Sequence, residues 1–193
     1  MRKRELALRY RTRLAIATAI FLIAGGAGVL WSSTRTDQNI TTRPAAELCS
    51  QPKPAPSLRG LADILLSNAA VFANLVLGGA LIWIRSLTQL LGVGFDAGTL
   101  VYVTLRVTRS PLFTVAAFVP HGIAEIAAFL GAAATGIRVG CVTLNALRRL
   151  DIEWKTETGS LGHELRVPAA LLVAAALIEE FVTTRVMDYV TCN

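Results

Sequence analysis

The chain has 193 residues, of which 53% are hydrophobic and 17% charged, with a formal net charge of +6 and a mean hydropathy of +0.54. A soluble domain of this length is less apolar, and the apolar residues here form runs close to the roughly 20 residues that cross a bilayer. The composition excludes an ordinary soluble domain and predicts an all-α, polytopic transmembrane bundle. The positive charge requires no nucleic acid as a partner, because membrane topology and attraction to anionic lipid headgroups account for it.

Residues 1–13 form a basic N-terminus, and the apolar run 14–31 follows directly. We interpret this run as an uncleaved first transmembrane helix, because it continues beyond the small residues 25–28 and ends at Trp31, which suits the membrane interface. A cleaved signal peptide is the alternative. Since Lys and Arg are enriched in short cytoplasmic segments, we expect a cell-membrane protein with its N-terminus in the cytoplasm.

Residues 32–60 are polar and rich in proline, and we interpret them as a loop on the outer face. Asn39 begins a glycosylation sequon in this loop, and whether it is modified stays open. Cys49 and Cys192 both lie outside in this topology and could form a disulfide bond. The three cysteines of the chain predict neither a disulfide framework nor a metal site.

Residues 61–190 form one membrane domain, with spans predicted at 61–84, 112–139 and 167–190. A weaker segment, 87–105, contains Asp96 and several glycines, so a tilted, broken or re-entrant element is the alternative to a full span. With the first helix, the chain has about five spans. An odd number of crossings places the C-terminus outside. The small-residue rows at 78–80 and 131–136 indicate close helix packing.

The connection at residues 144–165 repeats apolar residues at helical spacing, which predicts a short amphipathic helix on the inner leaflet that breaks at 158–160. This segment is either a connector that faces lipid or a docking surface for a partner. His163 lies in it, and we expect this histidine to be solvated.

The sequence Pro120-His121-Gly122-Ile123-Ala124-Glu125 lies inside an apolar run. An ionisable group costs about 3 kcal/mol at the centre of a membrane helix on insertion scales, so such groups usually have a partner or a function. His121 and Glu125 are four residues apart and share one helix face. Pro120 and Gly122 predict that a helix starts, breaks or kinks here.

Asn68 and Glu179 lie in two other predicted spans. Turning both toward His121 and Glu125 in the bundle interior avoids their exposure to lipid, so we predict a buried polar cluster of these four residues. Hydrogen bonding between helices is the favoured role, and a proton or ion pathway or a metal site are the alternatives.

Enzyme chemistry is not expected. The chain has no His-Glu-x-x-His motif, no Gly-x-Ser-x-Gly motif and no phosphate-binding glycine loop, and His121 and His163 are its two histidines. The spacing of these residues along the chain therefore predicts no metal, no cofactor and no catalytic residue.

Three blocks, at residues 64–71, 120–125 and 174–183, resemble the stage II sporulation protein M family. Asn68, His121, Glu125 and Glu179 stand at matching positions of these blocks. Ser67 replaces an asparagine that the family often has, and Thr184 stands where many members have proline.

The resemblance implies a multi-pass membrane protein without established catalytic activity. The founding member is implicated, with two partner proteins, in peptidoglycan remodelling during engulfment of the forespore. For this chain we expect a non-enzymatic membrane scaffold that assembles with other envelope proteins. The alternative is a small transporter or channel-like subunit that uses the His/Glu cluster. Besides the lipid bilayer and envelope proteins, a second copy of the chain is left open as a partner.

Overall fold

The computed structural model describes residues 2–35, 55–148 and 154–192, and every regular element in these residues is helical. This confirms the predicted all-α bundle. The elements are α1 (Arg2–Arg35), α2 (Leu58–Leu77), the 3₁₀ helix η3 (Gly78–Leu81), α3 (Ile84–Thr108), α4 (Pro111–Leu147), α5 (Trp154–Ile178), the π-helix η4 (Glu179–Thr183) and α6 (Thr184–Cys192).

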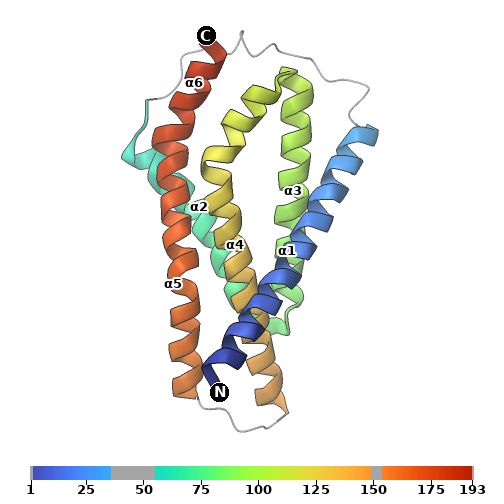
Figure 1. The fold of residues 1–193 in the computed structure, drawn as a ribbon, viewed down its shortest axis with the longest axis vertical. Coiled ribbons are helices and arrows are strands. Elements are labelled where there is room, and N and C mark those ends of the chain that lie inside the picture. Colours follow the sequence, from blue (N-terminus) through green and yellow to red (C-terminus); the bar gives the residue numbers. More distant parts are fainter. Residues whose placement is uncertain (1, 36–54, 149–153, 193) are drawn as a thin grey trace.

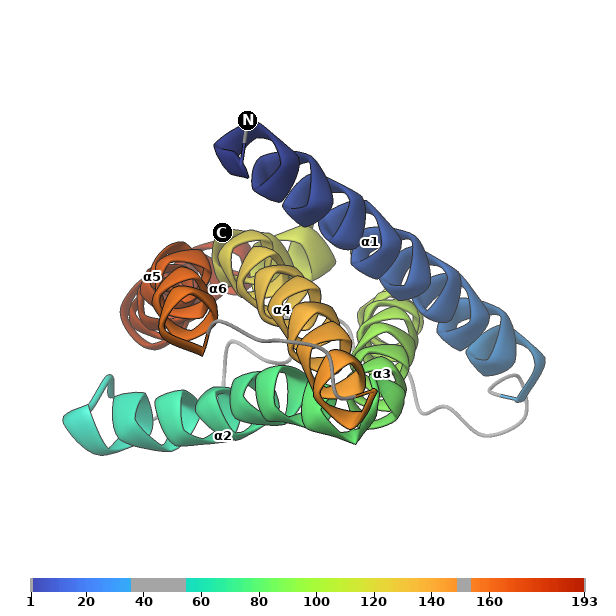
Figure 2. The same cartoon turned by 90° about the horizontal axis from the view of Figure 1, so that it is seen from below.

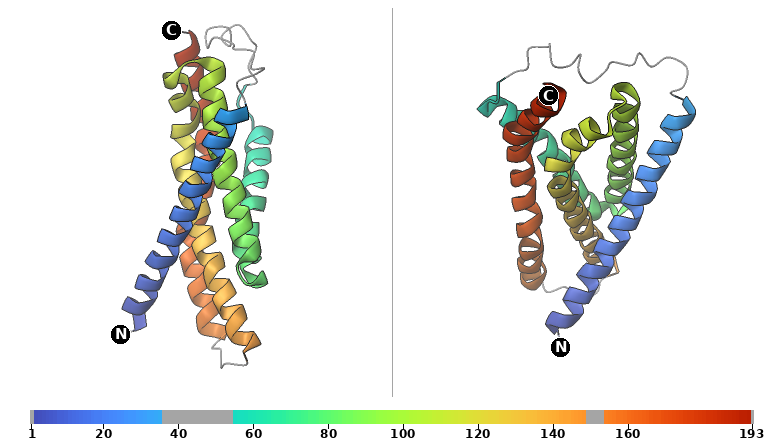
Figure 3. Two further views of the ribbon diagram at one scale, coloured as in Figure 1. Left: turned by 90° about the vertical axis from the view of Figure 1, so that its right-hand side faces the viewer. Right: turned by 45° about the horizontal axis from the view of Figure 1, so that its top comes forward.

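The helices alternate in direction along the long axis of the molecule, so α1 begins and α6 ends at opposite ends of the bundle (Figure 1). Figure 2 shows α4 near the centre, with α5 on one side and α3 on the other, while α1 and α2 lie across opposite faces. The two views in Figure 3 show that α5, η4 and α6 form one rod beside α4. The central core consists of Ala17, Phe21, Leu75, Leu90, Ala128, Phe129, Ala132, Ala133 and Leu172.

Within the described residues, four helices are long and apolar enough to cross a membrane: Tyr10–Arg35, Leu58–Leu81, Ile84–Thr108 and Pro111–Leu147. The weak segment 87–105 belongs to the third of them and is one uninterrupted α-helix, so the broken or re-entrant alternative does not hold. The predicted span 167–190 is not among the four, although it is helical throughout.

α4 runs through Pro120 and Gly122 without interruption, so a helix neither starts nor breaks there. The helix begins at Pro111. Ser110 is its N-cap residue, and the Ser110 side chain accepts a hydrogen bond of 3.1 Å from the backbone N–H of Phe113. Figure 1 shows the first turns of α4 inclined to the rest of the helix, in agreement with the predicted kink. Proline removes one backbone hydrogen bond and crowds the preceding turn, which bends a helix where its neighbours hold it together.

The predicted amphipathic helix on the inner leaflet is wrong. α4 continues to Leu147, and α5 begins at Trp154 and runs through residues 158–160. The hydroxyls of Thr158 and Ser160 donate hydrogen bonds of 2.8 and 3.0 Å to carbonyls one turn earlier, which lets both residues stay within the helix. His163 is exposed, as expected, but on a helix rather than a loop.

Glycines allow the helix backbones to approach closely. A Cβ atom on Gly79 would overlap the backbone of Gly136, and one on Gly98 would overlap the backbone of Gly25. The interpretation of the small-residue rows as packing surfaces is therefore confirmed.

α1 begins within the basic segment and continues past Trp31 to Arg35, so the first helix is longer than the predicted 14–31. α2 begins at Leu58, two residues before the predicted end of the outer loop. Asn39, Cys49 and the side chain of Cys192 lie outside the described part of the chain, so the sequon and the disulfide bond stay predictions.

Candidate functional site: a His/Glu cluster in a cavity between the helices

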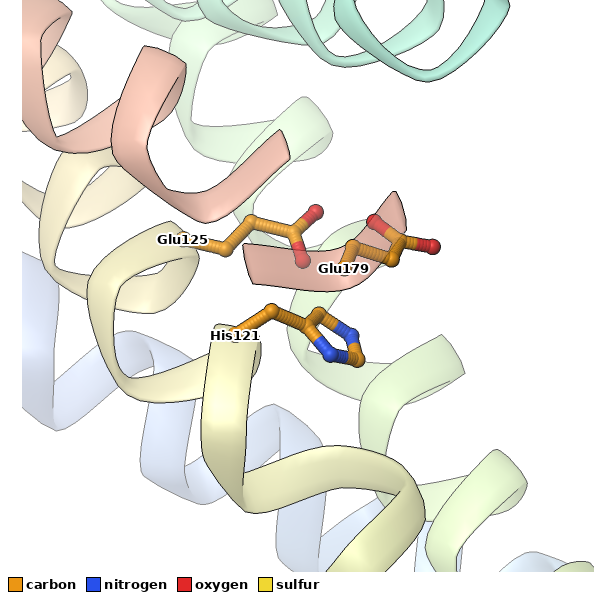
Figure 4. A group of neighbouring side chains, drawn as sticks. All are labelled: His121, Glu125 and Glu179. Carbon is orange, nitrogen blue, oxygen red and sulfur yellow. The ribbon is translucent and has the colours of Figure 1, made fainter. Parts of the chain in front are cut away.

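His121, Glu125 and Glu179 come together at the contact between α4 and η4. Each offers one ligand atom, and these atoms lie within 4.8 Å of one another. Figure 4 shows His121 and Glu125 one above the other on α4 with their side chains directed toward Glu179. All three residues are half-buried.

The π-helix η4 determines which residues of the C-terminal rod reach this cluster. The hydroxyl oxygen of Thr183 lies 3.1 Å from Nδ1 of His121, and the same hydroxyl donates a 3.3 Å hydrogen bond to the carbonyl of Ile178. A π-turn adds a residue to the helical turn and is frequent at functional sites. Glu179 and Thr183 in consequence both contact the α4 side.

Glu180, the next residue, points elsewhere. Its carboxylate accepts a 2.6 Å hydrogen bond from the backbone N–H of Ser57, immediately before α2. The two adjacent glutamates therefore have different environments: Glu179 belongs to the cluster, and Glu180 contacts the start of α2.

The cluster forms part of the wall of a cavity of about 930 Å³ that lies between α1, α2, α3, α4 and the C-terminal rod. Asn68 lies on the same wall, but the described hydrogen bonds do not connect it to the other three predicted residues. The cavity also has Asp63 on α2 and Asp96 on α3, and much of the remaining wall is apolar. Sequence reasoning had not assigned these aspartates to the site, although Asp96 was visible as a charge inside a predicted span.

A groove of about 360 Å³ along α3 adjoins this cavity. Its lining consists of Arg85, Thr88, Gln89, Gly92, Val93 and Asp96. Val93 and Asp96 line both the groove and the cavity. Asp96 therefore lies where the groove along the first half of α3 meets the cavity that contains the cluster.

A second polar cluster, which sequence reasoning missed, joins α1, α4 and α5. Oε1 of Glu164 accepts hydrogen bonds of 2.9 Å from both Arg13 and Arg138. Arg138 also donates to Glu157 at 2.6 and 3.1 Å and to the hydroxyl of Ser160. In the sequence, Arg138 was visible as a cation at the end of an apolar run, but its partners lie on another helix. Because these charges are paired with one another across the helix contacts, we assign them a structural role and not a ligand-binding one.

Comparison with known proteins agrees with the three sequence blocks. The profile of a family described as stage II sporulation protein M matches residues 16–184, which includes α1 from residue 16 onward as well as the later blocks. An uncharacterized protein of Methanocaldococcus jannaschii is 29% identical over 130 residues, which is 66% of this chain and 72% of that protein. No solved structure matches.

Proposed function

Because the chain belongs to the stage II sporulation protein M family, we propose that it is a non-enzymatic integral membrane protein that assembles with other proteins of the cell envelope. The observation that carries this proposal is the exposed polar groove on α3. Arg85, Thr88 and Asp96 are exposed in the single chain, although α3 has the length and composition of a membrane span.

Asp96 is at the midpoint of Ile84–Thr108, where a lipid-facing aspartate costs about 3 kcal/mol on insertion scales. A helix of another membrane protein placed along the groove would remove these side chains from lipid and supply a hydrogen-bond donor to Asp96. We therefore assign the groove as the surface that contacts an envelope partner.

Photo-crosslinking in native membranes tests this assignment. A photoreactive residue at position 88 lies in the groove, whereas one at Leu91 lies on an exposed part of the same helix outside the groove. We expect a discrete protein adduct from position 88 that is lost when Asp96→Leu is added, and mainly lipid adducts from position 91. Lipid adducts from both positions would contradict the proposal, and an adduct to a second copy would show self-association instead.

A small transporter or channel-like subunit is the second candidate, and the contact between groove and cavity at Asp96 favours it. Buried carboxylates that are reached through a polar route are typical of ion and proton pathways. Glu125→Gln separates the two functions, because glutamine keeps hydrogen-bonding capacity but cannot titrate. An assembly protein retains its thermal stability and its partner in this variant. Liposome flux that occurs in the unmodified protein and vanishes in Glu125→Gln, at unchanged stability, would replace the assembly proposal.

A further inference from the structure

We propose that His121, Glu125 and Glu179 bind one divalent transition-metal cation, with Zn²⁺ as the representative ion. This site goes beyond the assembly function and does not depend on it. The sequence left a metal site as an alternative role of the cluster, but the spacing of the histidines along the chain showed no metal motif. The donors come from α4 and η4, and the fold brings them within reach of one ion.

The donor set and its dimensions fit such an ion. Zinc binds imidazole nitrogen and carboxylate oxygen at about 2.0–2.2 Å, and sites with three protein ligands leave a fourth position open. Two ligands of one ion are then at most about 4.4 Å apart. The three donor atoms lie within 4.8 Å of one another. Side-chain rotations that move these atoms by about an ångström are therefore sufficient for all three to bind one ion.

The Thr183 hydroxyl holds Nδ1 of His121 at 3.1 Å. When this hydroxyl donates its one proton to the carbonyl of Ile178, it accepts from an Nδ1–H of His121, and Nε2 then has the lone pair that a metal ion requires. Metal-binding histidines usually have their second nitrogen held in this way by a neighbouring group.

The charges of the cavity favour a cation. Neither Lys nor Arg is among the described residues that line it, whereas Asp63, Asp96, Glu125 and Glu179 are. Two adjacent carboxylates repel each other in a medium of low dielectric constant. A divalent ion bound by Glu125, Glu179 and neutral His121 forms a complex with no net charge. This neutrality lowers the desolvation free energy of holding the ion within the membrane. The cavity provides access for the ion and space for a fourth ligand.

Zinc binding by the purified full-length chain tests the site. The protein is prepared in detergent without a polyhistidine tag, stripped with a chelator and dialysed against Zn²⁺, and bound zinc is measured by mass spectrometry. We expect one zinc per chain. We expect Glu179→Gln and His121→Asn to weaken binding at least tenfold, and Thr183→Val, which removes the hydroxyl that orients His121, to weaken it by about 10- to 100-fold.

A matched variant serves as the control. Glu180→Gln changes the neighbouring carboxylate, which contacts Ser57 and lies outside the cluster. This variant should bind zinc as the unmodified protein does. Absence of stoichiometric binding by the unmodified protein would overturn the site, and so would equal weakening by Glu180→Gln and Glu179→Gln. Because no partner protein is present, this result is independent of the crosslinking result.

Discussion

Arg138 of α4 and Glu164 of α5 form a buried salt bridge, with 2.9 Å between Nη1 and Oε1. The same Glu164 oxygen pairs with Arg13 of α1 at 2.9 Å. One carboxylate thus joins α1 to the consecutive helices α4 and α5. The cavity between the helices differs, because Glu125 and Glu179 have no such arginine partner among the described residues that line its wall.

Glu164→Ala should therefore destabilise the bundle. The substitution leaves Arg13 without this carboxylate and deprives Arg138 of one of its two, and breaking a buried ion pair typically costs about 3–5 kcal/mol. Lys155→Ala, which removes an exposed charge from the same helix, should change the stability by no more than about 0.5 kcal/mol. Reversible unfolding in detergent measures both. Equal stability of the two variants would show that the network contributes nothing.

Gly98→Ala should weaken the contact between α1 and α3, because the new methyl group would overlap the backbone of Gly25. We expect a loss of about 1–3 kcal/mol, the usual cost of overpacking. Gly92→Ala is the control on the same helix, since a Cβ there meets no atom within 4 Å, and alanine favours helix over glycine. Thermal unfolding should rank Gly92→Ala at or above the unmodified protein and Gly98→Ala below it.

Arg109→Gly should be more stable than Arg109→Ala. Arg109 ends α3 in the left-handed region, with φ of 51°. Glycine adopts this conformation without the Cβ strain of about 1–2 kcal/mol that other residues incur. Both variants lose the exposed arginine side chain, so their difference isolates the backbone effect. A chemical-unfolding comparison in which alanine matches glycine would contradict the assigned strain.

Cysteine labelling should place the two ends of the bundle on opposite sides of the membrane. A variant that keeps only Cys192 should react with a membrane-impermeant maleimide in intact cells. A variant that keeps only Cys141, which is exposed on α4, should react only after lysis. Protection of Cys192 in intact cells, with labelling after lysis, would contradict five crossings and a C-terminus outside.

The sequence alone was sufficient to predict membrane helices, because the length and hydropathy that allow a segment to span a bilayer depend on the residues of that segment. It also predicted a cluster of Asn68, His121, Glu125 and Glu179, since exposure of each to lipid is costly. The last three come together, whereas Asn68 lies on the same cavity wall without a described hydrogen bond to them. The local sequence was less reliable at residues such as Ser, Thr and Gly, which occur both within helices and at their ends. Residues 158–160 were expected to end a helix, but their hydroxyls bond within α5 and the helix continues.

Tertiary structure decided everything that depends on the register between helices. The sequence blocks assigned Glu179 to the cluster, but the different environment of the adjacent Glu180, which contacts the start of α2, follows from the π-turn η4. The contact of Thr183 with Nδ1 of His121 joins residues on two elements. Likewise, Arg138 and Glu164 become partners only when α5 packs against α4. Such contacts depend on the rotation and axial shift of whole helices, which are determined by the packing of the complete bundle and not by neighbouring residues in the chain.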